Sequence, residues 1–244
     1  MTPRITLAVA HRVLIQLRRD RRTSVMLLVL PCLVMSLLWW MFQDKPGFGF
    51  GALAPALLAL IPFIIMFLVT SVTTLRERTS GTLERLLAMP MGKGDFLVGY
   101  ALAFGLVAAV QSALAVGLSV WALDLHVQGP VWMLLLVAVV DAVLGSALGL
   151  FVSAFARTEF QAVQFMPALV VPQILLCGLF VARDELPPAL HTISDLLPLS
   201  YAVDAMRKVA RDSHPAMWGD LGLVAAFAVA GLVLGALTLR RQSE

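Results

Sequence analysis

Long apolar runs alternate with short polar segments along the whole chain. A run of about 18 or more apolar residues can cross the hydrocarbon core of a bilayer as a helix. The fifth such run contains Pro167 and Pro172, with Gly178 near its end, so we expect that helix to be interrupted. The pattern predicts an all-α membrane protein with six transmembrane helices, at about 23–43, 51–74, 96–122, 130–155, 160–181 and 217–239.

Composition supports a membrane protein before any motif is considered. Hydrophobic residues make up 60% of the 244 positions and charged residues 14%, with a mean hydropathy of +0.90. Soluble domains are about half apolar and a quarter charged. No stretch fits a soluble domain, so we expect residues 1–244 to form a single transmembrane domain.

The placement of Lys and Arg predicts the orientation. If the N-terminus is cytoplasmic, 13 of the 18 basic residues fall in inside segments, as the positive-inside rule expects. All five tryptophans then fall near outer span ends, where interfacial aromatic residues gather. Both termini are therefore expected in the cytoplasm. The first 22 residues are too charged for a signal peptide, so we expect the first span to be retained.

Residues 1–22 read as an amphipathic helix that precedes the first span. Apolar residues recur at a 3–4–3 spacing, at Leu7, Ala10, Leu14 and Leu17. Such a helix would lie in the membrane interface with its basic residues toward anionic headgroups. The alternative is a simple retention signal. The basic residues of the predicted interfacial helix are Arg12, Arg18 and Arg19.

Residues 183–215 are too polar for a span and too apolar for a simple exposed loop. Pro187, Pro188 and Pro198 divide the segment into short helical pieces. We expect these extracytoplasmic helices to be re-entrant, folding back against the outer membrane surface before the last span.

Several kinds of chemistry are missing from the sequence. It has no H-E-x-x-H motif, "GSALG" at 145–149 lacks the G-x-S-x-G order, and "MGKGD" at 91–95 lacks the phosphate-loop spacing. Cys32 and Cys177 lie in predicted spans and suggest packing residues. We therefore expect no catalytic residues and no metal site.

Asp141 is the only ionisable residue deep within a predicted span. An intramembrane carboxylate often marks an ion path or a hydrogen bond within the bundle. No second titratable residue in another span offers a relay partner, so a structural role is favoured. A proton-coupled secondary transporter that uses Asp141 remains the alternative from another functional class.

The stretch "RERTSGTLERLLAMP" at 76–90 is a polar segment between the second and third spans. Thr79 or Ser80 can cap a helix start, and Gly81 permits a tight chain reversal. Residues 82–88 then make about two turns before Pro90 ends the helix. So short a helix is unstable alone. It must dock on the ends of the spans or in the groove of another protein.

Two separated blocks of the sequence resemble one family. They are "ERTSGTLERLLAMP" and "LCGLFVARDELPPALHTISDLLPLSYAVDAMRKV", and both are similar to segments of the ABC type-2 transporter permeases. These permeases are membrane subunits of bacterial exporters that include the daunorubicin-resistance and nodulation-factor systems. One departure is that the family often has a hydrophobic–Pro pair where this chain has "VARDEL".

The resemblance implies partners rather than catalysis. Two permease subunits, identical or different, would form a pore in the bacterial inner membrane. Two copies of a separate ATPase subunit would hold ATP and Mg²⁺. This chain would then be no enzyme, bind no cofactor of its own and have no nucleic-acid partner.

The resemblance also implies that 76–90 holds a cytoplasmic coupling helix, lodged in a groove of the ATPase. Glu77 is expected to bridge to the N-terminal helix through Arg18 or Arg19. The implied coupling residues are Arg76, Glu77, Arg78, Gly81, Thr82, Leu83, Glu84, Arg85, Leu86 and Pro90.

The substrate class follows from the scarcity of polar groups in the spans, which hold few besides Gln111, Gln161, Gln164 and Gln173. A pathway with such walls suits a hydrophobic or amphiphilic molecule. The family resemblance favours a drug-like or lipid-like cargo and a role in multidrug resistance, with a glycan-exporting ABC permease as the alternative.

Overall fold

The computed structural model describes residues 3–42, 49–80 and 93–241, and helices dominate this part of the chain. Six helices are long and apolar enough to cross a membrane, so the expected all-α architecture with six membrane-spanning helices is confirmed. The elements in order are α1 (Pro3–Arg19), α2 (Arg21–Phe42), α3 (Phe50–Thr79), α5 (Lys93–Gly117), the π-helical turn η1 (Leu118–Ala122), α6 (Val131–Ser153), α7 (Glu159–Leu176), the 3₁₀ turn η2 (Arg183–Glu185), α8 (Pro188–Asp195), α9 (Pro198–Arg211) and α10 (Trp218–Arg241).

Two predicted boundaries and one predicted interruption differ from the structure. The second span continues past residue 74, because α3 ends at Thr79. The fifth ends at Leu176, before the expected residue 181. The expected interruption by Pro167 and Pro172 is wrong, since α7 runs through both residues. A single proline removes only one backbone hydrogen bond, and membrane helices tolerate this loss.

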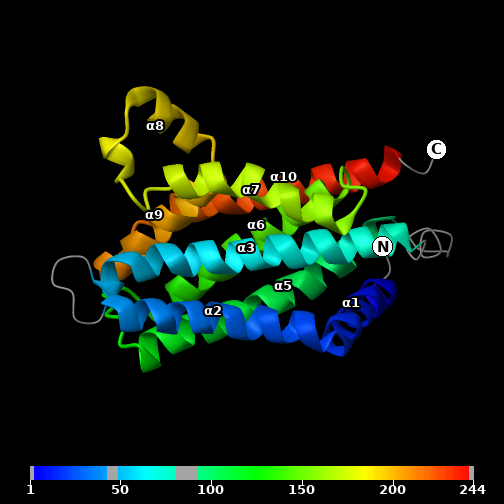
Figure 1. Cartoon of the computed structure of the whole chain (residues 1–244), viewed down its shortest axis with the longest axis horizontal. Helices are drawn as coiled ribbons and strands as arrows, with labels where there is room; N and C mark the ends of the chain where they lie inside the picture. Colours follow the sequence, from blue (N-terminus) through cyan, green and yellow to red (C-terminus); the bar gives the residue numbers. More distant parts are fainter. Residues whose placement is uncertain (1–2, 43–48, 81–92, 242–244) are drawn as a thin grey trace.

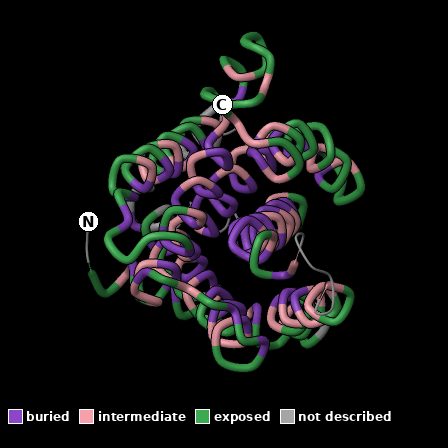
Figure 2. Tube along the Cα trace, turned by 90° about the vertical axis from the view of Figure 1, so that its left-hand side faces the viewer, coloured by how far each residue is buried: buried purple, intermediate pink, exposed green. Residues whose placement is uncertain are grey.

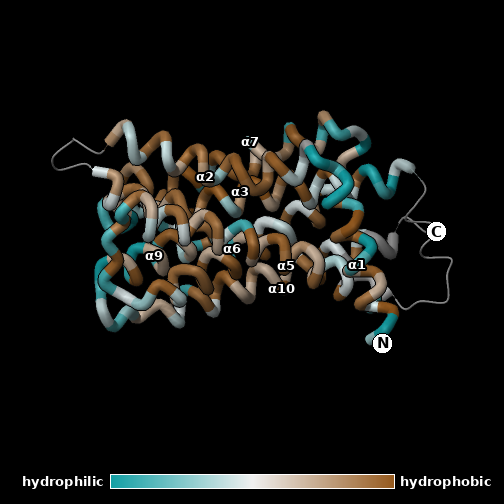
Figure 3. Tube along the Cα trace, turned by 90° about the horizontal axis from the view of Figure 1, so that it is seen from below, coloured by the Kyte–Doolittle hydropathy of each residue, from teal (hydrophilic) through white to brown (hydrophobic). Residues whose placement is uncertain are grey.

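The long helices form one elongated bundle with two distinct ends (Figure 1). One end, here called the α1 end, contains α1 and the C-terminal ends of α3 and α10. The opposite end, called the α9 end, holds α8 and α9. Hydrophilic residues gather toward the two ends, and the middle is mostly hydrophobic (Figure 3). This distribution is the one that a bilayer-spanning bundle requires.

Helices α3 and α6 form the centre of the bundle. In each, 61% of the most apolar window is buried, compared with 17% in α2 and in α7. Figure 2 shows the same contrast, with buried segments inside and exposed segments on the outer helices. The outer faces of α2 and α7 are therefore covered little by the rest of the described chain.

Helices α3 and α6 touch backbone to backbone at two glycines. A Cβ atom added to Gly145 would lie 2.3 Å from the Phe63 carbonyl oxygen, and one added to Gly149 would lie 2.4 Å from that of Phe67. Glycines four residues apart let membrane helices approach closely. The "GSALG" segment is thus a helix-packing surface.

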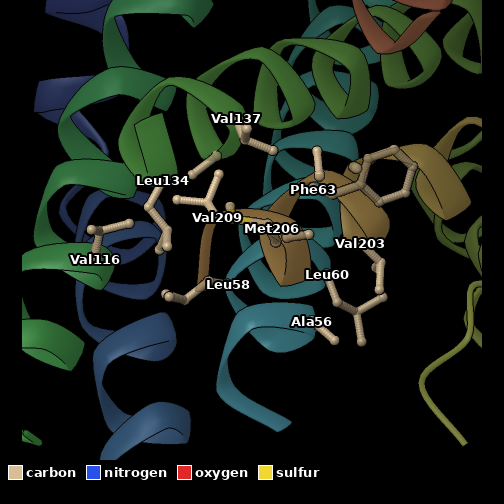
Figure 4. Close-up of a cluster of buried hydrophobic side chains, with 14 of the residues drawn as sticks. Ala56, Leu58, Leu60, Phe63, Val116, Leu134, Val137, Val203, Met206 and Val209 are labelled. Carbon is tan, nitrogen blue, oxygen red and sulfur yellow. The ribbon is translucent and has the colours of Figure 1, made fainter. Parts of the chain in front are cut away.

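The α9 end is closed by an apolar face of α9. Side chains of α9 meet those of α3 and α6 in a shared core (Figure 4). The segment predicted at 183–215 therefore contains short helices as expected, and α9 packs into the bundle; its re-entrant character remains a prediction. The labelled members of this core include Leu58, Leu60, Phe63, Leu134, Val137, Val203, Met206 and Val209.

Arg183 holds the segment between α7 and α9 together. Its guanidinium pairs with Asp204 on α9 and with Asp195 at the end of α8, the latter at 2.5 Å. It also donates to the Ser194 hydroxyl at 2.9 Å and lies 5.1 Å from the centre of the Tyr201 ring. Four polar or aromatic partners from two helices thus converge on one cation.

We predict that Gly149→Ala destabilises the bundle, because the new methyl group would push α3 away from α6. Overpacking of this kind costs about 1–3 kcal/mol. The matched control is Gly222→Ala in α10, where an added Cβ meets nothing within 4 Å. That change should be neutral or stabilising, since alanine favours helix by about 0.5–1 kcal/mol. Thermal unfolding in detergent measures both; equal melting temperatures would contradict the close approach.

Candidate functional site

The last turn of α3 carries three consecutive charged residues, Arg76, Glu77 and Arg78. Successive residues of a helix are rotated by about 100°, so their side chains point in three directions. Each of the three contacts a different part of the chain. We call this group, with its direct partners, the α3-end cluster.

Glu77 faces α1. It is 3% exposed, and its Oε1 accepts a hydrogen bond from Arg12 Nη2 at 3.2 Å. The bridge from Glu77 to the N-terminal helix is therefore present, but the expected partners Arg18 and Arg19 are wrong. Arg19 lies on the same flank of α1 as Arg12, seven residues further along, which is about 10 Å along the helix axis.

Arg76 faces the connection between α1 and α2 and the start of α7. Its Nε and Nη2 donate to the two carboxylate oxygens of Glu159, at 2.7 and 3.0 Å. Its Nη1 lies 3.7 Å from Asp20 Oδ2. Asp20 in turn binds the backbone N–H and hydroxyl of Thr23 at the start of α2. The Arg76 side chain is still 53% exposed, which leaves it accessible to another protein.

Arg78 faces the C-terminal end of α6. Its Nη1 donates to the carbonyl oxygen of Ser153, the last residue of α6, at 2.7 Å. A cation at this position satisfies a terminal carbonyl and favours the negative end of the helix dipole. The α3-end cluster therefore connects α3 with α1, α2, α6 and α7.

Helix α1 is fixed to the bundle by part of its predicted apolar stripe together with residues outside it. Of that stripe, Ala10 and Leu17 are buried, whereas Leu7 is 61% exposed. Val9 and Val13, which the predicted stripe left out, are buried in the same core, and the interfacial placement of the helix remains a prediction. The helix ends at Arg19, with Asp20 separating it from α2. The inward face packs on α5, where Thr6 donates to Asp95 at 3.0 Å.

The other predicted coupling residues follow α3 directly. Ser80 ends the helix, and the Thr79 hydroxyl donates back to the carbonyls of Leu75 and Arg76 at 3.1 and 3.2 Å. The remaining members of the predicted set lie outside the described residues. These are Gly81, Thr82, Leu83, Glu84, Arg85, Leu86 and Pro90.

Asp141 is fully buried near the middle of α6, one turn before Gly145. Neither of its carboxylate oxygens has a hydrogen-bond partner among the described residues. Within that same part of the chain, no group of three His, Cys, Asp or Glu side chains could hold a metal ion. Asp141 is thus placed as an isolated polar group, with no second titratable side chain bonded to it.

An apolar groove of about 570 Å³ lies beside α1, between α2 and α5. Its walls are mostly leucine and valine, and Arg18, Arg21 and Ser24 supply the polar side chains. Arg18, expected to face headgroups, therefore borders a groove. A second apolar groove of about 200 Å³ lies between α2 and α3, and Arg76 is among its lining residues. Such walls accept a hydrocarbon group with a cationic contact at one end.

We predict that Arg12 and Glu77 are energetically coupled. Arg12→Gln leaves the buried Glu77 carboxylate without its cation, which should cost about 1–3 kcal/mol of the free energy of unfolding. The double variant Arg12→Gln/Glu77→Gln should lose less than the sum of the single variants. Arg19→Gln, at an exposed position of the same helix, is the matched control and should be near neutral. Additive losses in a double-mutant cycle would argue against the pair.

Comparison with known proteins agrees with this architecture. The chain is 26% identical over 155 residues to "Probable multidrug ABC transporter permease YbhR" of Escherichia coli, covering 64% of this chain and 42% of that protein. It is 24% identical over 171 residues to "Linearmycin resistance permease protein LnrN" of Bacillus subtilis, covering 69% and 44%. With "ABC transporter G family member 20" of Dictyostelium discoideum it shares 27% over 157 residues, covering 64% and 22%.

These matches therefore span less than half the length of each of the three relatives. The family model of the ABC-2 type transporter matches residues 5–210, which is most of the sequence. That range includes all members of the α3-end cluster and α9 except its last residue, Arg211. The chain belongs to the ABC-2 type transporter family.

Proposed function

We propose that the chain is the transmembrane permease subunit of an ATP-driven exporter in a bacterial inner membrane. It moves a hydrophobic or amphiphilic substrate, drug-like or lipid-like, out of the cytoplasm or the inner leaflet. The observation that carries the proposal is the α3-end cluster, which ties four other helices to the turn that immediately precedes residues 81–90.

In this proposal the chain supplies mechanical coupling. Two copies of a separate ATPase subunit hold ATP and Mg²⁺ and contact residues 81–90. A displacement there reaches the end of α3 first. From α3 it passes to α1 through Glu77, to α7 through Arg76 and to α6 through Arg78. A polar set that joins several rigid helices can carry such a displacement.

The orientation follows from charge. The α1 end holds α1 with its arginines and the close of α3, and the tryptophans fall at the opposite ends of their helices. We infer from the positive-inside rule that the α1 end, both termini and residues 81–92 lie in the cytoplasm. This is the side on which a soluble ATPase can reach the coupling segment.

The apolar grooves support the substrate class. The groove of about 570 Å³ offers leucine and valine walls with Arg18 and Arg21 at its polar side, which suits an amphiphile better than a glycan. The printed names of two relatives, multidrug and linearmycin resistance permeases, point to the same class. The exposed faces of α2 and α7 offer surfaces for a second permease subunit, identical or different.

A proton-coupled transporter that uses Asp141 is the second candidate. Its supporting observation is the buried carboxylate itself. A relay needs at least one further titratable group along the path, and no such group is bonded to Asp141 in the described chain. Asp141→Asn separates the candidates, because it abolishes transport in a relay and spares ATP-driven export.

We predict that Leu83→Glu or Leu86→Glu uncouples ATP hydrolysis from export. Arg76→Gln should lower coupling as well, because it releases α7 and the α1–α2 connection from the coupling segment. The matched control is Arg157→Gln, an exposed arginine between α6 and α7. Export and substrate-stimulated ATP hydrolysis are measured in vesicles that contain the permease and its ATPase.

The expected result is a loss of export of at least about tenfold for the two leucine variants, with unchanged membrane insertion and wild-type export for Arg157→Gln. A tenfold change corresponds to about 1.4 kcal/mol of coupling free energy. The purified permease alone should hydrolyse no ATP. Transport by the permease without any ATPase would contradict the proposal directly.

A further inference from the structure

A separate cavity lies at the α9 end, on the far side of the bundle from the α3-end cluster. It measures about 370 Å³. Three elements form it: the start of α3, the segment after η1 and the last turn of α9. Its lining residues are Gly51, Ala52, Pro55, His126, Val127, Gln128, Arg207, Ala210 and Arg211.

The walls of this cavity are held in place by backbone hydrogen bonds. The N–H of Gln128 donates to the carbonyl of Ala210 at 3.1 Å, and that of Gly129 donates to the carbonyl of Val209 at 3.0 Å. These hydrogen bonds therefore hold the segment that carries His126 against the C-terminal end of α9. The cavity is a formed feature of the fold and needs no rearrangement to exist.

Two arginines on one helix face supply the charge. Arg207 and Arg211 are four residues apart on α9, a spacing that places them on the same side of the helix. Burial and the nearby charge of Arg211 lower the pKa of Arg207 below its usual value. Like charges at this spacing repel each other unless an anion lies between them.

No carboxylate lines the cavity in the described chain. Asp204, one turn before Arg207 on α9, is held by Arg183. Asp212 accepts a hydrogen bond from the N–H of His214. Among the described residues neither arginine forms an ion pair, and Nε of Arg207 is buried without a hydrogen-bond partner. Asp204 offsets part of the Arg207 charge from a distance, but in the part of the chain that the structure describes no carboxylate is paired with either arginine.

The N-terminal end of α3 adds to the positive electrostatic potential in the cavity. No side chain caps this helix start, and although the N–H of Ala52 donates to the carbonyl of Gly49 at 3.1 Å, the first turn of a helix carries a positive partial charge. Trp132 and Trp218, at the first turns of α6 and α10, lie 6.4 Å apart at this end of the bundle. Tryptophans mark the level of the lipid headgroups, where phosphate groups are abundant.

We propose that this cavity binds the phosphate group of a phospholipid or of another phosphate-bearing amphiphile, with Arg207 and Arg211 as its anion-binding residues. Guanidinium groups bind phosphate oxygens with paired, charge-assisted hydrogen bonds. The apolar wall formed by Ala52, Pro55 and Val127 accepts the first carbons next to the headgroup. In the orientation proposed above, this site faces away from the ATPase.

The test measures binding to the purified full-length chain in detergent, without ATP or ATPase. The probes are short-chain phosphatidylglycerol, short-chain phosphatidylcholine and inorganic phosphate, each titrated by calorimetry. We expect phosphatidylglycerol to bind and Arg207→Gln/Arg211→Gln to weaken it at least about tenfold. Lys208→Gln is the matched control, because Lys208 lies on α9, is exposed and pairs with Asp220 at 2.5 Å. It should change the affinity less than about twofold.

The arms distinguish the source of the phosphate group. Binding of inorganic phosphate as tightly as of the lipids supports a site for the phosphate alone, and preferential binding of the two lipids supports a headgroup site. Higher salt should weaken binding in either case. No binding by any probe, or equal affinity in the double variant and the wild type, overturns the proposal.

Two further variants keep the test decisive. Arg211→Gln alone changes an exposed residue at the end of α9, so it reports on binding even where Arg207→Gln lowers the melting temperature. Asp44 precedes α3 in sequence and lies outside the described residues. If only Asp44→Asn creates binding, the arginines are neutralised by their own chain and the proposal is wrong. None of these outcomes bears on ATP-driven export.

Discussion

The backbone contact between α3 and α6 is the constraint on which the other features depend. Gly145 and Gly149 bring α6 against the carbonyl groups of α3, and the two helices become the most buried part of the bundle. Helix α3 is therefore tightly packed and extends between the two polar ends of the bundle. Its C-terminal end carries the α3-end cluster, and its N-terminal end forms one wall of the cavity lined by Arg207 and Arg211. A bilayer cannot hydrogen-bond an exposed backbone, so tight packing of intact helices is the available route to such rigidity.

This arrangement separates two kinds of surface. Contacts that hold the bundle together lie between α3, α6, α9 and α10, where small residues and apolar side chains interlock. Helices α2 and α7 lie outside this centre and keep most of their apolar surface uncovered. The apolar grooves that border α2 lie in this less packed layer. A transporter needs elements that can move against a fixed frame, and loosely packed helices open at low cost in free energy.

The six membrane-spanning helices could be predicted from the sequence because the length of an apolar run must match the thickness of the bilayer. The sequence also placed Glu77 next to the N-terminal helix and identified the charged turn at Arg76–Arg78. It did not identify Arg12 as the partner of Glu77, since the partner depends on the position at which α1 packs on α5. Neither could it add Val9 and Val13 to the buried face or remove Leu7 from it, because apolar residues on both sides of α1 have helical spacing. Glu159 and Asp20 could be recognised in the sequence only as acidic residues at the starts of helices. That pattern is common and does not identify Arg76 as their partner.

The energies expected for exposed and buried ion pairs assign different roles to the Arg76–Glu159 and Arg12–Glu77 salt bridges of the α3-end cluster. Arg76 and Glu159 are about half exposed, and exposed ion pairs contribute about 0–1 kcal/mol to stability. This pair therefore does little to hold the fold, and its exposure leaves Arg76 available to exchange partners. Glu77 is buried against Arg12, and a buried charge without its partner costs several times more. In the coupling function that we propose, the buried Glu77 pair is the permanent joint between α3 and α1, and the exposed Arg76 pair is the contact that is remade when α3 moves.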